Sequence, residues 1–401
     1  MINVHSKALN QDITVNRIIA NIKGEQAGPT LIFVGGIHGN EPAGVFALQR
    51  VAEHLTSEKI NLNGNIICLA GNLRALKKGI RYHKEDLNRV WTKDRISHLP
   101  ESTKDVAHEE IAEQIEIYAE IQKILKSNTG PFYFFDIHTT SSETLPFLTV
   151  NDSLLNRAYT SQYPLPMILG IEEYLNGPIL SYINELGYVA FGFEAGQHDD
   201  LSSIENAEAF CYLSMVFTGV LSKDDIAFQH YFDLLAKTTG DIKYVYEIYF
   251  RYLIKNGEKF AMEPGFFNFQ RVHKNQLVAI SNGKEVRAKT NGRIFMPLYQ
   301  DQGVDGFFAI RRIRRSFLRL SEKLRKLRAD RILAWLPGIK WVDPEKSTLL
   351  VNKRVARFLA KDVLHLFGYR QIYRDKYELK MINREAKART EDYQDTSWLN
   401  L

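Results

Sequence analysis

The sequence predicts an α/β fold whose central sheet is covered by helices on both faces. Four short segments are continuously apolar, and segments with helical patterns separate them along the chain. Strands with no polar alternation are typical of a sheet that is buried on both sides. The predicted strands are "TLIFV" (30–34), "NIICLAGNL" (65–73), "PFYFFDIHTT" (131–140) and "LGYVAFGFEAG" (186–196).

Two helices are predicted between these strands. The stretch "PAGVFALQRVAEHL" has apolar residues at helical spacing and begins with Pro42, a residue favoured in the first turn. The stretch from 97 to 125 reads as a second helix, with Ser102 or Thr103 as its N-cap.

The pattern changes near residue 240, and we expect three regions. After a catalytic α/β domain over 1–239, alternating segments such as "KYVYEIYFRYLI" and "QLVAISNG" predict a β-rich domain over 240–312 that caps the cleft. The remainder, 313–401, is expected to be a helical, basic C-terminal extension.

Composition restricts the class of protein. No apolar run reaches the roughly 20 residues that span a bilayer, and the first residues lack the pattern of a signal peptide. The two cysteines, Cys68 and Cys211, lie in apolar segments and are expected to be buried thiols in a reducing compartment. We therefore expect a cytoplasmic protein.

The net charge of +5 is concentrated in the stretch from Arg311 to Arg331. Within it, five apolar residues fall on one helical face: Ile313, Phe317, Leu320, Leu324 and Leu327. We expect this face to dock on the protein and the basic face to be solvated. Contact with an acidic membrane surface, a nucleic acid or a partner subunit remains the alternative.

Polar residues fall at the same end of every predicted strand, where functional residues of α/β sheets collect. These residues are His38 and Glu41, Asn72 and Arg74, Asp136 and His138, and Glu194.

The two histidines and the first glutamate suit zinc. A catalytic zinc site takes three protein ligands and leaves one position for water, and His38, Glu41 and His138 would supply these ligands to one zinc ion per chain. Glu194 would be the proton shuttle that such a site needs. By itself, "VGGIHGNEPAG" (34–44) could equally be a glycine-rich turn.

The loop "GNLRALKKGIRYHKEDLNRVW" (71–91) holds three arginines and is interpreted as a clamp for an acidic substrate. The planar guanidinium of Arg89 binds carboxylates, and Asn88 adds a donor beside it. The alternative is a polar surface loop. His198, four residues after Glu194, could line the pocket or face solvent.

The order "GGIHGNEPAG", "GNLRALKKGIRYHKEDLNRVW", "FFDIHTTSS", "GFEAG" resembles the succinylglutamate desuccinylase/aspartoacylase family, a branch of the zinc-carboxypeptidase-like enzymes. The resemblance covers about residues 30–312 and implies an α/β/α domain with a mixed central sheet. It implies zinc on His38, Glu41 and His138, with Glu194 as general base and then acid. It also implies that Asp136 supports a metal ligand.

The resemblance further implies that Arg81 polarises the scissile carbonyl, while Asn88 and Arg89 hold the α-carboxylate of a small acidic substrate. Aspartoacylases carry an arginine about ten residues before the catalytic glutamate, where this chain has Asn184, and a tyrosine near the position of Phe307. N-acetylaspartate is therefore not the expected substrate.

The expected activity is zinc-dependent hydrolysis of the amide bond of an N-acyl amino acid. A metallocarboxypeptidase acting on peptide C-termini would use the same groups in a wider pocket. A non-catalytic binding protein that uses the basic tail is the alternative from another class, and a homo-oligomer is possible.

Overall fold

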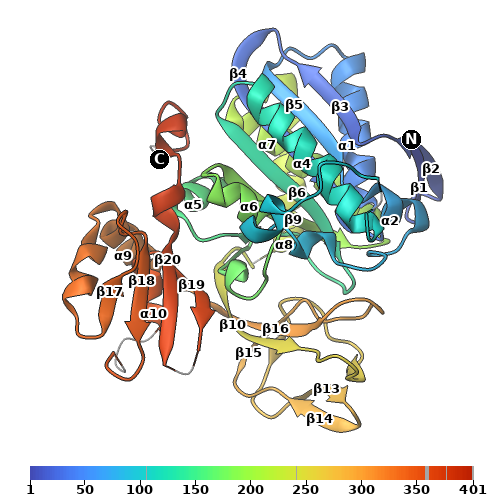
Figure 1. The fold of residues 1–401 in the computed structure, drawn as a ribbon. Helices are drawn as coiled ribbons and strands as arrows, with labels where there is room; N and C mark the ends of the chain where they lie inside the picture. Colours follow the sequence, from blue (N-terminus) through green and yellow to red (C-terminus); the bar gives the residue numbers. More distant parts are fainter. Residues whose placement is uncertain (105, 241, 357–360, 376, 400–401) are drawn as a thin grey trace.

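A mixed sheet of 11 strands forms the centre of the molecule (Figure 1). The structure is a computed structural model that describes residues 1–104, 106–240, 242–356, 361–375 and 377–399. From edge to edge the strands are β12 (Arg271–Val272), β15 (Gly292–Phe295), β16 (Asp305–Arg312), β10 (Val245–Leu253), β8 (Met167–Leu169), β7 (Phe147–Val150), β9 (Val189–Gln197), β6 (Phe132–Thr140), β4 (Gln26–Gly35), β5 (Asn63–Ala70) and β3 (Ile18–Lys23).

The four predicted strands are confirmed as β4, β5, β6 and β9. They are adjacent and parallel, in the order β9-β6-β4-β5, so their carboxyl ends lie at one edge. The register pairs His138 with Glu194 across β6 and β9. The predicted α/β fold with a mixed sheet is confirmed, because antiparallel strands flank this parallel centre.

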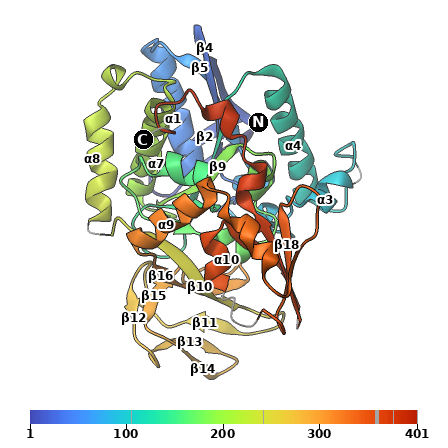
Figure 2. The ribbon, with the colours of Figure 1, turned by 90° about the vertical axis from the view of Figure 1, so that its left-hand side faces the viewer.

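Both faces of the parallel centre are covered, as the apolar strands predict. Successive side chains of a strand point to opposite faces. Leu31 and Phe33 accordingly join the core under helices α1 (Ala43–Ser57) and α7 (Leu201–Thr218). Ile32 and Val34 join the core under α4 (Glu109–Ser127) and α6 (Ile179–Glu185). Figure 2 shows α1 and α7 on one side of the sheet and α4 on the other.

The second predicted helix is shorter than expected. Helix α4 begins at Glu109, and the extended residue at its N-cap is His108 rather than Ser102 or Thr103. The apolar repeat begins only after this point, and Pro100 disfavours a helix through the residue before it. The other helices before residue 240 are α2 (Leu73–Lys78), α3 (Lys93–Ser97), α5 (Leu154–Thr160) and α8 (Phe228–Thr239).

The region 240–312 is rich in strands, as predicted. Strands β10, β15 and β16 lengthen the central sheet, and β11 (Phe260–Met262), β13 (Leu277–Ser281) and β14 (Lys284–Arg287) form a small sheet beside it. A further hairpin joins β1 (Ile2–Ser6) and β2 (Gln11–Val15). The boundaries of the three expected regions remain a prediction.

The prediction of a helical extension after residue 312 is wrong for most of its length. Helix α9 (Arg315–Lys326) and the short α10 (Lys361–Leu366) accompany a four-stranded antiparallel sheet (Figure 1). Its strands, in order, are β17 (Ile339–Trp341), β18 (Thr348–Asn352), β20 (Glu378–Asn383) and β19 (Tyr369–Arg374). These strands are short and charged residues separate them, so the preceding helical pattern dominated the prediction.

Helix α9 also differs from expectation in which face it buries. Phe317, Leu320 and Leu327 are exposed, whereas Ser321 and Arg325 are buried. Of the five predicted stripe residues, Ile313 and Leu324 are partly buried and pack against hydrophobic cores. Arg325 donates to Asp152 of the first region and to Glu385, so ion pairs hold this helix together with part of the apolar stripe.

The last described residues return to the core of the first region. Tyr393 and Trp398 are buried there, and Trp398 Nε1 donates to the hydroxyl of Tyr133 on β6 over 3.2 Å. Cys68 and Cys211 are buried free thiols, as expected. Among the described residues, we find no helix with the length and apolar character needed to cross a bilayer.

Candidate active site

The glycine-rich turn after β4 places two side chains at the carboxyl edge of the sheet. Gly36 has a φ of 72°, a conformation that favours glycine. At Gly39 an added Cβ would lie 2.1 Å from the backbone carbon of Ala75, so a side chain has no room. The two glycines let the chain turn sharply, and both His38 and Glu41 are buried.

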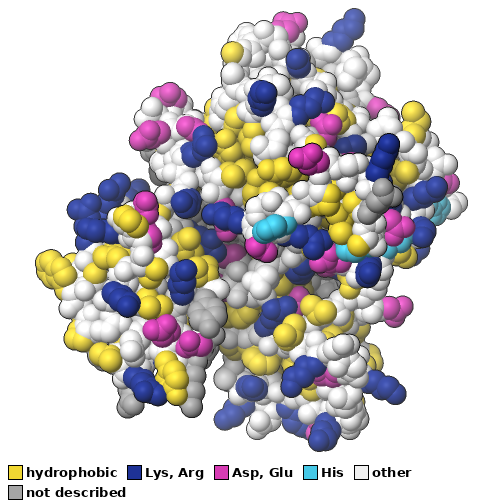
Figure 3. Space-filling view, viewed as in Figure 1, with side chains coloured by type: hydrophobic (Ala, Val, Ile, Leu, Met, Phe, Trp, Pro, Cys, Tyr) yellow, Lys and Arg dark blue, Asp and Glu magenta, His cyan; other side chains and the backbone are white. Residues whose placement is uncertain are grey.

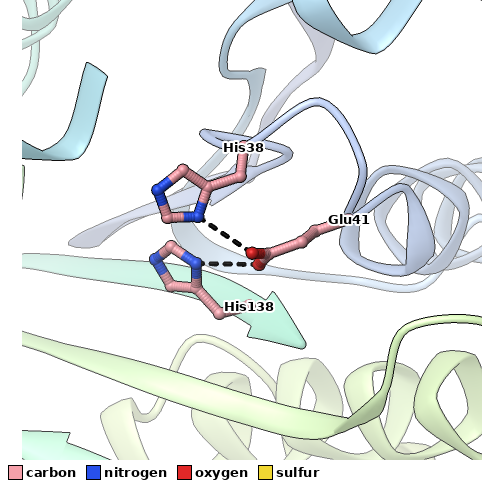
Figure 4. Close-up of side chains that lie close together, drawn as sticks. All are labelled: His38, Glu41 and His138. Carbon is pink, nitrogen blue, oxygen red and sulfur yellow. Dashed lines mark hydrogen bonds and ion pairs between the residues drawn. The ribbon is translucent and has the colours of Figure 1, made fainter. Parts of the chain in front are cut away.

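His38, Glu41 and His138 lie together, as Figure 4 shows. The Glu41 carboxylate lies between the two rings: Oε1 is 2.9 Å from Nδ1 of His38, and Oε2 is 3.0 Å from Nδ1 of His138. One possible ligand atom from each residue lies within 4.8 Å of the others. Two imidazole nitrogens and a carboxylate oxygen form the donor set of many catalytic zinc sites.

The other nitrogen of each ring contacts a carboxylate of its own. Nε2 of His38 is 3.0 Å from Asp86, and Nε2 of His138 is 2.7 Å from Asp136. Metal-binding histidines usually have such a partner, which fixes the orientation and tautomer of the ring. With both Nε2 atoms engaged, the Nδ1 atoms that face Glu41 are the available ligands. The residues present therefore fit a zinc ion.

The charges of the cluster depend on each other. Burial tends to raise the pKa of Glu41, but His38 and His138 hold it well below its usual value. Burial tends to lower the pKa of His138, but Asp136 and Glu41 hold it well above its usual value. Burial also opposes ionisation of Asp86, yet His38, Arg89 and Arg81 hold its pKa well below the ordinary value. Glu41 and Asp86 are thus ionised at neutral pH.

Glu194 lies beside this cluster on β9 and has a different character. It is buried, and its Oε2 has no hydrogen-bond partner among the described residues. Burial is the main reason that its pKa is raised to about 8; Glu41 and Asp136 add to this effect, and His138 and Arg81 oppose it. A carboxyl group whose pKa is near neutrality can accept and return a proton.

Arg81 connects the turn after β4 with the loop before the 3₁₀ helix at Leu87–Arg89. Its guanidinium donates to Glu41 Oε1 over 3.3 Å and to Asp86 Oδ2 over 3.1 Å. Burial tends to lower the pKa of Arg81, whereas the two carboxylates raise it, so the group carries a positive charge at the centre of the site.

Asn88 and Arg89 reach the site, and protein groups contact most of their polar atoms, although Nε of Arg89 has no hydrogen-bond partner among the described residues. The amide oxygen of Asn88 accepts from the backbone N–H of Ile179 over 2.9 Å, and its nitrogen lies 3.3 Å from His138 Nε2. Arg89 donates to the backbone carbonyl of Asn88 over 2.8 Å and lies 3.7 Å from the carboxylate of Asp305.

The cluster opens into a cavity of about 320 Å³, at the small end of ligand sites. Its wall includes the four predicted loop and strand-end groups Arg81, Asn88, Arg89 and Glu194, and also residues from the β-rich region such as Met296, Leu298 and Phe308. His198 lines it, with Nδ1 2.8 Å from the Thr139 hydroxyl and Nε2 3.2 Å from Gln300.

Arg74 and Asn184 lie outside the cavity. Arg74 pairs with Glu113 at 2.7 Å and with Glu116, away from the cavity, so it is not part of the clamp. Asn184 lines a neighbouring cavity and donates to the backbone carbonyls of Tyr188 and Ala190.

Sequence reasoning missed two carboxylates of this site. Asp86 lies in the loop beside Asn88 and Arg89, and this position is the sequence signal that points to it. Asp305 follows a strand pattern 216 residues after Arg89 in the chain, and we see no sequence signal that pairs the two.

Comparison with known proteins points to one family. Residues 27–209 match the sequence profile of the succinylglutamate desuccinylase/aspartoacylase catalytic domain. A succinylglutamate desuccinylase of Chromobacterium violaceum is 26% identical over 121 residues, which are 29% of this chain and 34% of that protein. The chain thus matches about a third of the length of this relative.

Solved structures show the same fold over a longer range. A succinylglutamate desuccinylase of Vibrio cholerae superposes with a TM-score of 0.54 at 13% identity, covering 78% of this chain and 91% of that one. A succinylglutamate desuccinylase/aspartoacylase of Rhodobacter sphaeroides gives a TM-score of 0.54 at 15% identity, covering 73% and 88%. Residues 27–209 thus match the catalytic domain of the succinylglutamate desuccinylase/aspartoacylase family, and the solved structures show that the fold is shared over a longer range.

Proposed function

We propose that the protein is a zinc-dependent hydrolase that cleaves the amide bond of a small N-acyl amino acid. The observation that carries the proposal is the Glu41 carboxylate, which lies between Nδ1 of His38 and Nδ1 of His138 while Asp86 and Asp136 hold the opposite ring nitrogens. When bound, zinc supplies a Lewis acid that lowers the pKa of a coordinated water to about 7.

Glu194 transfers the proton in this proposal. Its unpartnered Oε2 is the acceptor for the proton of the attacking water, and the same oxygen then delivers that proton to the leaving amine. Its burial beside Glu41 favours the protonated form, which makes the return of the proton easier.

Arg81 is the group that stabilises negative charge on the carbonyl oxygen. Its guanidinium is fixed by two carboxylates before substrate arrives, so no reorganisation is needed when charge develops.

The substrate carboxylate is assigned to Arg89. In this structure Arg89 lies near Asp305, and a substrate carboxylate would compete with Asp305 for the guanidinium. The cavity of about 320 Å³ favours a small amide over a peptide chain, so the amidohydrolase is preferred to the metallocarboxypeptidase.

A substrate screen tests the proposal. Purified protein with its zinc content measured would be incubated with N-acyl amino acids that vary in acyl group and side chain, with C-terminal peptides alongside. We expect turnover of at least one acidic N-acyl amino acid. Cleavage of the peptides alone would favour the carboxypeptidase, and zinc-loaded protein that cleaves neither group would reject the proposal.

A further inference from the structure

Helix α9 and the residue after it present an exposed apolar stripe. Two apolar residues of the helix and the one that follows it face solvent, with exposed fractions of 40% for Phe317, 47% for Leu320 and 78% for Leu327. Leu320 and Leu327 are seven residues apart and therefore lie on one face. Ser321 and Arg325, on the side of the helix next to this stripe, are buried. The helix buries an arginine and exposes leucines.

The apolar character continues beyond the helix. In the following 3₁₀ segment, Ala329–Trp335, Ile332 is 51% exposed and Trp335 is 85% exposed. None of these side chains lines the cavities described above. An exposed surface of this kind on a soluble chain usually marks a contact site.

Positive charge accompanies the stripe. Between Arg311 and Arg331 the chain carries ten arginine and lysine residues and two acidic residues. The exposed cations beside the apolar positions include Arg315, Arg319, Lys323 and Arg328. Figure 3 shows Lys and Arg side chains gathered with hydrophobic ones over α9, at the left edge of the molecule.

We propose that α9 and the 3₁₀ segment after it form a docking surface for anionic phospholipid membranes. An amphipathic helix with leucine, phenylalanine and a tryptophan on one side and cations beside them is the form that lies in a lipid interface. The cations match the negative charge of lipid head groups, and each is worth about fivefold in affinity. The apolar side chains enter the boundary between head groups and acyl chains.

The arrangement favours a lipid surface over a protein partner. The apolar side chains project from a helix surface rather than line a groove, and lysine and arginine surround them on the same element. The centres of protein interfaces are depleted of charged residues, whereas lipid interfaces accommodate long cationic side chains at the edge of the apolar zone.

Vesicle binding tests the proposal. The full chain would be sedimented with vesicles of phosphatidylcholine containing phosphatidylserine, and with vesicles of phosphatidylcholine alone. We expect binding to the anionic vesicles that weakens as salt is added. The double variant Leu320→Ser with Leu327→Ser should bind at least tenfold more weakly. Arg315→Gln with Arg319→Gln should also bind at least tenfold more weakly.

The matched control is the double variant Leu201→Ser with Leu253→Ser. These leucines are 44% and 52% exposed and lie outside the stripe, so binding should not change. A second measurement needs no variant: vesicles with brominated acyl chains should quench the fluorescence of the exposed Trp335, whereas Trp91 and Trp398 are buried.

Three results would overturn the proposal. The first is that the protein binds neither kind of vesicle at low salt. The second is equal loss of binding in the stripe variants and in the matched control. The third is a dimer in solution that Leu320→Ser with Leu327→Ser converts to monomer, since the stripe would then be covered by a second copy of the chain.

Discussion

Glu41 connects the candidate metal ligands to one another. Its two carboxylate oxygens each face a different histidine, and the backbone N–H of Thr139 also donates to Oε2 over 3.0 Å. The turn after β4 and the end of β6 are therefore joined by one side chain. This explains why two residues three positions apart and a third 97 positions later can serve one ion.

Replacing His38 by alanine should abolish zinc binding, because it removes one of three ligands and leaves Glu41 with a single imidazole. Zinc per chain, measured by atomic emission after dialysis, should fall from about one to near zero. His98→Ala, at an exposed histidine, is the control and should retain zinc. Full zinc content in His38→Ala would remove this residue from the site.

Replacing Glu194 by glutamine should separate binding from chemistry. The amide keeps the shape of the side chain but cannot take a proton, so kcat should fall by about 10²–10⁴ while zinc content stays unchanged. The measurement is turnover of the best substrate from the screen alongside metal analysis. Turnover within a few-fold of the original would show that another group moves the proton.

The residues of the candidate site differed in how far the sequence could predict them. His38 and Glu41 follow a predicted strand, and His138 and Glu194 lie near the carboxyl ends of two others. Parallel strands bring their carboxyl ends to one edge. The orientation of Asn88, which points to Ile179 and His138, depends on how a loop packs. The pairing of Arg89 with Asp305 depends on where the β-rich region meets that loop.

At the scale of elements, a buried ion pair holds α9 to the first region. Arg325 is buried and donates from Nη2 to Asp152 over 3.0 Å and from Nη1 to Glu385 over 3.1 Å. Arg370 and Arg157 also pair with Asp152. An isolated buried carboxylate is costly, so these pairs must form together with the docking of the helix.

Arg325→Met should lower the free energy of unfolding by about 1–3 kcal/mol, because Asp152 and Glu385 lose a charged donor while Arg370 and Arg157 still pair with Asp152. Lys326→Met is the matched control, since the neighbouring Lys326 is exposed and its pair with Glu322 is worth at most about 1 kcal/mol. Denaturant unfolding of both variants gives the comparison. Equal stabilities would mean that the buried pair contributes little.

The sequence predicted α9 itself but not its orientation. A helical pattern identifies an apolar face, and burial of that face is the usual outcome. Here the complementary charges of Arg325 and Asp152 decide which face is inside, and their pairing joins residues 173 positions apart. The strands β17 to β20 were missed because each is short and the segments between them are polar.

At the scale of the whole molecule, Glu172 links stability to pH. It lies at the junction of the first region and the extension, 3.7 Å from Arg384. Burial raises its pKa to about 7, against an ordinary value of 4.5. The folded state therefore holds a proton that the unfolded state releases between these values, so this contribution is complete below about pH 4.5 and is lost as pH rises through 7.

Glu172→Gln should remove this pH dependence. The wild type should lose about 3 kcal/mol from this group between pH 4.5 and pH 8, which the variant should not lose. Thermal unfolding at several pH values measures the difference, which should favour the variant more as pH rises. A constant difference across this range would show that Glu172 does not titrate as described.

The parallel centre of the sheet was predictable from the sequence, whereas the strands added at its edge and the path of the C-terminal segment were less so. Apolar strands separated by helices fix a covered sheet, but the joining of β10 and β16 to that sheet depends on long-range edge pairing. The return of the chain to the first core was not predicted, since Tyr393 and Trp398 follow a polar, charged stretch.

That return has a consequence for biosynthesis. Tyr393 and Trp398 pack against Tyr133 of β6. Residues near the end of the chain, which are synthesised after the whole extension, therefore complete the core around a strand of the first region. Domains generally fold in the order in which they are synthesised. The contacts that Tyr133 makes with these two rings can therefore form only after the segment up to residue 398 has been synthesised.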